Sequence, residues 1–248
     1  MEEQKYELLP SVIEVKNYHN DESGFFNVFM HCCIAWELRN NRIWEPHLHE
    51  VFEKYITKDS VVLEAGCHIG SHSIKLSKLS KKLYCFEPLK QSNEVLMLNL
   101  NNNNCNNTIL SNKGLSDEIG TSYFDWIPIG NLGGSGLVNN PMGNPGHPSW
   151  LSKEDEKYNI DLTTIDSLNL DQLDFMKLDV EGYEPKVLLG GINTIKKYRP
   201  IITLESWSNH FGGLDFEYTK NQFKMLLDLN YTITQINPNG PDWLFLPQ

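Results

Sequence analysis

The chain has 248 residues, which is enough for one α/β domain with a full hydrophobic core. Its formal net charge of -11 argues against a nucleic-acid backbone or an anionic membrane surface as the main partner, because both are negatively charged. The five cysteines are an odd number without a C-x-x-C pair, which indicates reduced thiols rather than a disulfide framework or a zinc site. Because no secretory or membrane-spanning segment is recognisable, we expect a soluble, cytoplasmic protein.

We expect residues 1–44 to form a small N-terminal extension, with a hairpin, packed on a main domain that spans residues 45–248. Residues 25–30 have the pattern of a strand, whereas residues 32–38 fit either a second strand or a helix. A helix is predicted from Glu45-Pro46 onward, since proline suits a first helical turn and Glu45 complements the helix dipole there. His47 and His49 on this helix are interpreted as surface residues.

A short apolar run at residues 61–63 predicts a buried strand that leads through a glycine turn into a helix over residues 71–80. The turn has Glu64, Gly66 and Gly70, and its spacing excludes two cofactor motifs. A dinucleotide fingerprint needs glycine where the chain has His68, and the P-loop spacing is also absent. The remaining acidic-x-Gly-x-x-x-Gly pattern resembles motif I of class I S-adenosylmethionine (SAM) methyltransferases.

A second buried strand, over residues 82–86, ends at Glu87, 17 residues after Gly70. In a βαβ unit, an acidic residue at this place reaches the hydroxyl groups of a ribose. A third strand at residues 108–110 leads to a turn with Ser116 and Asp117. We predict that these two residues meet the adenine amino group, the alternative being that they only form the turn.

The middle of the chain contains a strand at residues 121–126 and then a segment rich in Gly, Pro and Asn over residues 127–152. A loop of this length inside a compact domain is often a lid or a binding loop. Residues 160–168 predict a further strand, at an edge of the sheet.

Carboxylates gather after the next two predicted strands. The strand over residues 173–179 ends at Asp179, with Glu181 and Glu184 before a helix over residues 186–198. Three carboxylates so close together are costly unless a cation is near, and a sulfonium, an ammonium or a metal ion would serve. The alternative, a solvated helix start that favours acidic residues, explains Glu184 better than Asp179. The following strand ends at Glu205.

A helix over residues 219–229 and a hairpin of residues 231–236 and 242–246 complete the predicted elements. Four predicted strands therefore end in carboxylates, namely Glu64, Glu87, Asp179 and Glu205. The carboxyl ends of strands in an open α/β sheet form one ligand-binding crevice, so we expect these four residues to share a site.

Beyond these single signals, the chain resembles the FkbM family of SAM-dependent O-methyltransferases from about residue 44 to its end. The resemblance is carried by Trp44-Glu45-Pro46, Glu64-x-Gly66-x-x-Ile69-Gly70, Phe86-Glu87-Pro88, Gly133-Gly134-Ser135, Thr164-Ile165-Asp166, Lys177-Leu178-Asp179-Val180-Glu181-Gly182-x-Glu184, Leu189-Gly190-Gly191, Arg199-Pro200 through Glu205, and Trp243-Leu244-Phe245-Leu246-Pro247.

The resemblance implies an α/β, Rossmann-like class I methyltransferase fold. Its sheet is a mainly parallel seven-stranded one with a C-terminal antiparallel hairpin, and helices cover both faces. It also implies methyl transfer to a hydroxyl group, with sugars and polyketide-type natural products as typical acceptors. The chain departs from the family at two places. Glu64 stands where Asp is usual, and Cys67-His68 stands where Ala-Asn is usual.

Methyl transfer to an alcohol needs the oxygen aligned with the C–S bond and a group that accepts its proton. His210 is the first candidate base and Asp179 the second. Alternatively, Mg²⁺ held by Asp179 and Glu205 would lower the pKa of the hydroxyl. We predict that SAM is bound by Glu64, Gly66, His68, Gly70, Glu87, Ser116, Asp117, Asp179 and Glu181.

The predicted function is therefore SAM-dependent O-methylation of a sugar, a glycan or a similar small molecule, with neither nucleic acid nor a membrane as partner. Two alternatives belong to other classes. The first is a catalytically silent domain that binds SAM and acts as a scaffold, and the second is an RNA or protein methyltransferase.

Overall fold

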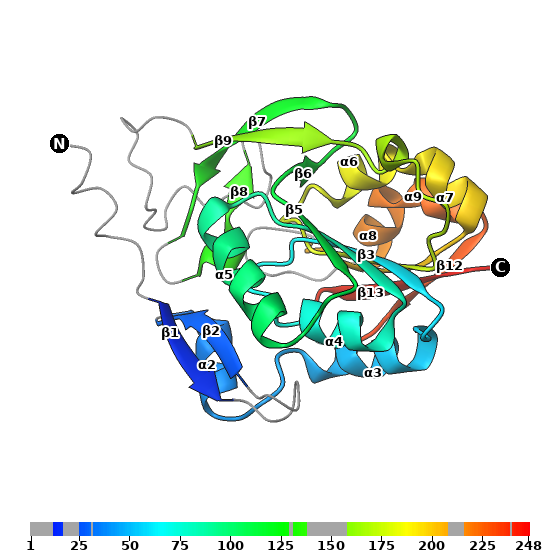
Figure 1. Cartoon of the computed structure of the whole chain (residues 1–248). Helices are drawn as coiled ribbons and strands as arrows, with labels where there is room; N and C mark the ends of the chain where they lie inside the picture. The colour runs from blue at the N-terminus through cyan, green and yellow to red at the C-terminus, as the bar shows by residue number, and fades with distance from the viewer. Residues whose placement is uncertain are drawn as a thin grey trace.

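A computed structural model describes residues 12–16, 25–30, 32–128, 131–137, 158–207, 216–238 and 240–248. Its centre is a seven-stranded sheet with the strand order β12-β13-β11-β10-β3-β4-β5 (Figure 1). The strands are β3 (Val61–Ala65), β4 (Lys82–Phe86), β5 (Thr108–Ser111), β10 (Phe175–Leu178), β11 (Ile201–Glu205), β12 (Tyr231–Gln235) and β13 (Asp242–Pro247). The strands β3, β4, β5, β10 and β11 run parallel to one another, and β13 is antiparallel to both β11 and β12. This arrangement confirms the predicted fold class and its C-terminal hairpin.

Helices cover both faces of this sheet (Figure 1). Neighbouring strand residues point to opposite faces, so Val62 belongs to one buried cluster and Leu63 to the other. The first cluster includes residues of α3 (Pro46–Tyr55), α4 (Ser73–Leu79) and α5 (Lys90–Asn102). The second includes residues of α6 (Glu184–Leu189), α7 (Ile192–Tyr198) and α9 (Lys224–Asp228), beside which lies α8 (Phe216–Gln222).

Two predicted helices are each divided into two. The segment 186–198 breaks at Gly190 and Gly191, between α6 and α7. A Cβ atom on Gly190 would lie 2.0 Å from the Ser116 carbonyl oxygen, so only glycine allows this close approach. The segment 219–229 breaks between α8 and α9 at Phe223, whose side chain is fully buried.

A second sheet has four strands in the order β6-β9-β7-β8. They are β6 (Gly114–Leu115), β7 (Gly120–Trp126), β8 (Gly136–Leu137) and β9 (Tyr158–Thr163), and the 3₁₀ turns η1 (Leu132–Gly134) and η2 (Asp166–Leu168) accompany them. The prediction of an edge strand over residues 160–168 was wrong. The strand, β9, ends at Thr163. It lies between β6 and β7 and pairs with both, so neither of its sides is a sheet edge. Most of the predicted loop 127–152 lies outside the described residues.

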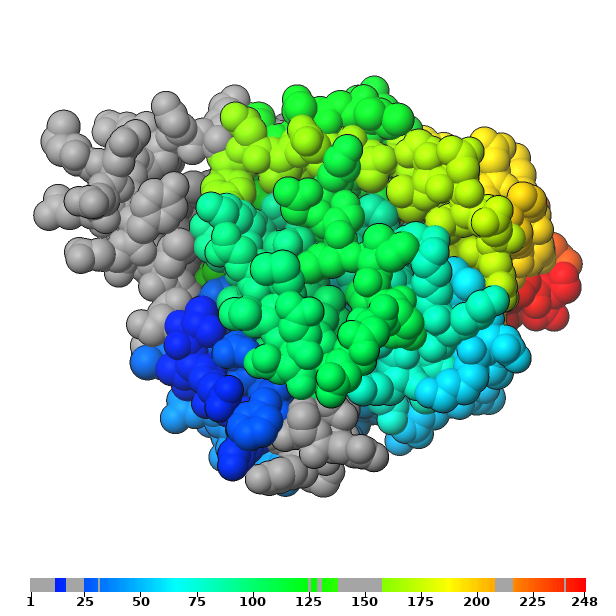
Figure 2. Space-filling view, in the orientation of Figure 1, coloured from blue at the N-terminus to red at the C-terminus, as the bar shows by residue number. Residues whose placement is uncertain are grey.

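The N-terminal residues form β1 (Val12–Lys16) and β2 (Phe25–Phe29), which pair antiparallel, and then the helix α2 (Cys33–Arg39). Figure 2 shows the strands of this hairpin directly beside the body of the molecule. The Asn99 side chain on α5 binds both backbone groups of Asn27, accepting from its N–H at 2.6 Å and donating to its carbonyl at 2.9 Å. These bonds hold β2 against α5. The predicted domain boundary near residue 44 stays a prediction.

All five cysteines are free thiols. Among the helices in the described part of the chain, none combines the length and hydropathy needed to cross a membrane.

Candidate active site

The carboxyl ends of β3, β4, β10 and β11 lie at one edge of the sheet, where two adjoining cavities open. The first, here called the apolar cavity, has a volume of about 540 Å³ including its open mouth. The second, the polar cavity, has a volume of about 700 Å³ measured in the same way. The residues that line both cavities are Gly66, Glu87, Gly133, Asp179 and Glu181.

The two cavities differ in their chemistry. Side chains such as Phe86, Leu115 and Tyr183 give the apolar cavity a largely hydrocarbon lining, which suits a flat ring system. The polar cavity is lined by histidine, lysine and carboxylate side chains, including His68 and Lys177. One elongated ligand could therefore place an apolar ring in one cavity and charged groups in the other.

Glu87 lies where the two cavities meet, and its carboxylate is fixed by two backbone donors. The His68 N–H donates to Oε2 at 2.8 Å, and the Leu89 N–H donates to Oε1 at 2.9 Å. Burial raises the pKa of Glu87 to about 7, although both backbone hydrogen bonds act in the opposite direction. A carboxylate held in this way keeps lone pairs that can accept hydrogen bonds from ligand hydroxyl groups.

The loop between β3 and α4 comes close to β10. Gly66 has a φ of 77°, and a Cβ atom there would lie 1.6 Å from the Asp179 carbonyl oxygen. His68 and Gly70 also have positive φ angles, of 48° and 88°. Of the three loop residues predicted to bind SAM, Gly66 and His68 line the cavities, whereas Gly70 shapes the loop and lines neither cavity.

The structure places Glu64 beneath the site rather than in its lining, where it was predicted. Its side chain is 1% exposed and lines neither cavity. The Ser73 hydroxyl donates to Oε2 at 2.5 Å, and the Lys177 ammonium lies 4.0 Å from Oε1. The carboxylate therefore faces the start of α4 and a buried lysine.

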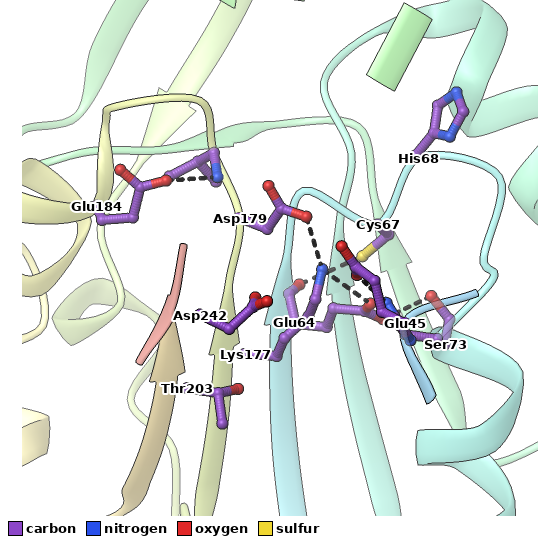
Figure 3. Close-up of polar contacts among 12 residues, drawn as sticks. Glu45, Glu64, Cys67, His68, Ser73, Lys177, Asp179, Glu184, Thr203 and Asp242 are labelled. Carbon is purple, nitrogen blue, oxygen red and sulfur yellow. Dashed lines mark hydrogen bonds and ion pairs between the residues drawn. The ribbon is translucent and has the colours of Figure 1, made fainter. Parts of the chain in front are cut away.

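Lys177 on β10 lies between the side chains of Glu64 and Asp179 (Figure 3). Its ammonium group donates to the Asp179 carboxylate at 3.0 Å. Burial would lower the pKa of Lys177, but the neighbouring carboxylates of Asp179, Glu64 and Glu45 outweigh it and raise that pKa. Lys177 is therefore a cation, and it offsets part of the negative charge of the site.

Three carboxylates line the polar cavity as a group, here called the acidic triad: Asp179, Glu181 and Glu205. One oxygen atom of each lies within 4.8 Å of the others. Burial and then the charge of Asp179 raise the pKa values of Glu181 and Glu205 well above their ordinary range. Such a group favours a cation between its members. Glu184, in contrast, accepts the Val180 N–H at 2.8 Å at the start of α6, as a helix-start residue does.

Ser116 and Asp117 line neither cavity. The Ser116 hydroxyl donates to the Asp117 carboxylate at 2.9 Å, and its backbone is packed against Gly190. The structure thus gives no support to their predicted contact with adenine, and Gly114 and Leu115 line the apolar cavity instead. The predicted base His210 lies outside the described residues.

The sequence interpretation missed Glu45 and His72, which both line the polar cavity. Oε2 of Glu45 lies 2.8 Å from Nε2 of His72. His49 was wrongly predicted at the surface. Its ring is buried, with its centroid 5.4 Å from that of His72 and 6.0 Å from that of Phe52. The sequence did contain one signal for Glu45, namely an acidic residue directly before Pro46. A favourable interaction with the helix dipole explained that residue equally well.

Comparison with protein families gives a match to the methyltransferase FkbM domain over residues 64–233. The chain belongs to the FkbM methyltransferase family. The matched region contains the glycine loop, Glu87 and the acidic triad, so these features of the site lie within the family domain. Comparison with curated proteins finds no match.

Among solved structures, the chain is similar to methyltransferase FkbM from Methylobacillus flagellatus KT, with a TM-score of 0.52 and 13% identity. The similarity covers 79% of this chain and 50% of that one, so the chain spans half of the length of that protein. At this identity, the similarity shows that the two FkbM-type chains share a fold. A weaker similarity is to an rRNA methylase from Streptococcus thermophilus, with a TM-score of 0.47, 14% identity, and coverage of 81% of this chain and 95% of that one.

Proposed function

We propose that the chain is a SAM-dependent O-methyltransferase that acts on a hydroxyl group of a sugar, a glycan or a similar small molecule. The position of Glu87 carries the proposal, since its fixed carboxylate lies between an apolar and a polar cavity. SAM has an adenine ring, a ribose and a charged methionine part in the same order. The residues present fit this cofactor, with the apolar cavity for adenine and Glu87 for the ribose hydroxyl groups.

When bound, SAM supplies an electrophilic methyl group on a positively charged sulfur. The acidic triad of Asp179, Glu181 and Glu205 would face that charge across the polar cavity. Electrostatic attraction of this kind positions the cofactor, and it requires no movement of the carboxylates when the ligand binds.

The proton of the acceptor hydroxyl needs a base. His210 remains our first candidate. Asp179 was the second, and its carboxylate accepts a hydrogen bond from the Lys177 ammonium at 3.0 Å. Glu205 is a further candidate, because burial and then the charge of Asp179 raise its pKa well above the ordinary range. A carboxylate of raised pKa is a stronger proton acceptor.

The acidic triad is also a ligand set that suits Mg²⁺, as proposed for Asp179 and Glu205. Turnover with and without a chelator distinguishes the two uses of these carboxylates. If a metal activates the hydroxyl, EDTA abolishes turnover and added Mg²⁺ restores it. If the triad faces the cofactor alone, turnover in EDTA is unchanged.

The acceptor is best tested by transfer of a labelled methyl group from SAM. The purified chain is incubated with panels of mono- and oligosaccharides, of structured RNA and of peptides, and the labelled product is identified by mass spectrometry. We expect an O-methylated saccharide, since the net charge of -11 disfavours RNA. Label on RNA or peptide would contradict the proposed acceptor. SAM binding without product in any panel would favour the silent scaffold.

A further inference from the structure

Glu45 occupies a place in the polar cavity that the proposed function leaves unassigned. The methionine part of SAM carries an α-ammonium group, for which a carboxylate inside the cavity would be a favourable partner. The acidic residue of the glycine motif, Glu64, cannot be that partner, because it lines neither cavity and is bound by Ser73 and Lys177. We propose that Glu45, held by His72, binds the ammonium group of the methionine part of SAM. This inference rests on the proposed function.

The position of Glu45 within the polar cavity supports this assignment. Glu181 and Glu205 also line a small neighbouring pocket, together with Trp207 and Tyr218, so they lie at one side of the polar cavity. Glu45 is hydrogen-bonded instead to His72, which follows the glycine loop. If the ribose of SAM lies at Glu87 and the cofactor follows this loop, its methionine part reaches Glu45. The side of the cavity with Glu181 and Glu205 then remains free for the methyl acceptor.

The backbone at Glu45 is strained in a way typical of functional residues. Its φ and ψ angles are 46° and 63°, in the left-handed region that a residue with a long side chain seldom occupies. Pro46 then begins α3. This conformation places the Glu45 carboxylate in the cavity lining rather than on the surface, with its side chain only 24% exposed.

His72 orients the carboxylate without neutralising it. The His72 side chain is 3% exposed, and burial lowers its pKa well below the ordinary value, so the imidazole is neutral. Its Nδ1 atom has no hydrogen-bond partner among the described residues, which fits a ring that carries its proton on Nε2. Nε2–H then donates to Oε2 of Glu45 at 2.8 Å and leaves further lone pairs for an ammonium group.

The charge of the cavity calls for such a ligand. Among the described residues that line the polar cavity, Lys177 is the one permanent cation, whereas five residues of the lining carry carboxyl groups: Glu45, Glu87, Asp179, Glu181 and Glu205. A ligand with both a sulfonium and an ammonium group would reduce this excess of negative charge at two points. A cation at Glu45 would also relieve the repulsion between that carboxylate and Asp179.

Calorimetric titration with three ligands tests the inference. S-adenosylhomocysteine (SAH) has the amino group, its deaminated analogue lacks only that group, and 5′-methylthioadenosine lacks the whole amino-acid part. Glu45→Gln should weaken SAH binding about 10- to 100-fold, because a charge-assisted hydrogen bond is lost, and should leave methylthioadenosine binding unchanged. Wild type should bind the deaminated analogue about 10- to 100-fold more weakly than it binds SAH. Glu45→Gln should bind SAH and the deaminated analogue with nearly equal affinity, because it already lacks the charged partner of the amino group.

Glu50→Gln, at an exposed position of the same helix, is the matched control and should bind all three ligands like wild type. The inference is overturned if Glu45→Gln binds SAH as wild type does, or if it weakens SAH and methylthioadenosine equally. Should Glu45→Gln fail to fold, Glu64→Gln is titrated instead with SAH and its deaminated analogue. It should lose as much affinity on removal of the amino group as wild type does, and a smaller loss would assign the ammonium group to Glu64 and overturn the inference. If wild type binds no SAH at all, the proposed function itself fails.

Discussion

His68 shows how one residue can serve the site through its backbone. Its φ of 48° is left-handed, and this conformation aims its N–H at the Glu87 carboxylate. Asn and His are among the non-glycine residues that tolerate this region best. The exchange from the Asn usual in the resembled family to His therefore keeps the loop. The imidazole itself packs near the Phe29 ring, at a centroid distance of 5.8 Å, and neither ring nitrogen has a hydrogen-bond partner among the described residues.

Substitutions at position 68 separate backbone from side chain. His68→Asn should bind SAH within about threefold of wild type, because asparagine adopts the left-handed region readily. His68→Val should bind at least about tenfold more weakly, since a β-branched residue resists that region and moves the N–H away from Glu87. Calorimetry with SAH measures both. Equal losses in the two variants would mean that the imidazole, and not the backbone, matters.

At the scale of elements, β10 joins the sheet to the site through Lys177. In the register of β10 with β3, Lys177 is paired with Glu64, and two residues later the chain reaches Asp179. The lysine is 3% exposed, so it is a buried cation between Glu64 on β3 and Asp179, which directly follows β10. Removal of one partner of such a group leaves the other charge buried without compensation.

Lys177→Met should therefore lower the free energy of unfolding by about 3–5 kcal/mol, measured by urea denaturation. The double variant Lys177→Met/Glu64→Gln should recover part of that loss, because the fully buried Glu64 is then no longer a carboxylate without a partner. Lys196→Met, at an exposed position on α7, is the control and should change little. Additive losses in the double variant would show that Lys177 and Glu64 do not interact.

The elements also show what a single sequence can reveal. The seven strands of the main sheet were predictable, since short β-branched runs such as residues 61–63 mark buried strands. The place of β9 in a second sheet was not, because strand pairing depends on distant partners. The same holds within the site. The sequence predicted that Glu64 and Glu87 lie at strand ends, but the contacts of Glu64 with Lys177 and Ser73 decide that it faces away from the cavities.

At the scale of the whole molecule, buried carboxyl groups make stability depend on pH. Burial is the main cause that raises the pKa values of Glu45, Glu87 and Glu184 to about 7, from an ordinary value of 4.5. The folded state thus binds more protons than the unfolded chain between these values, and stability falls as pH rises through 7. Buried His49 and His68, with pKa values lowered from 6.5 to about 3 and 4, act in the opposite direction, but only below pH 6.5.

Above pH 6.5 the histidine effect ends, and the Cys33 thiol, whose pKa a hydrogen bond with Cys32 lowers to about 7, opposes only part of the carboxyl effect. Without ligand, the free energy of unfolding should fall by about 1–2 kcal/mol between pH 6.5 and 8, which lowers Tm by a few degrees. Thermal unfolding at constant ionic strength measures this change, and Glu87→Gln should make it smaller. A Tm that is flat or rises over this interval would contradict the assignment of these carboxyl groups.

The central claim is that the two cavities at the strand ends bind SAM, with Glu87 at its ribose. Calorimetric titration with SAH of wild type, Glu87→Gln and the exposed control Glu94→Gln tests it most directly. We predict one site per chain in wild type and in Glu94→Gln. Glu87→Gln should bind about 10- to 100-fold more weakly, because a charge-assisted acceptor is lost. Absence of binding in wild type, or equal affinity in Glu87→Gln, would contradict the claim.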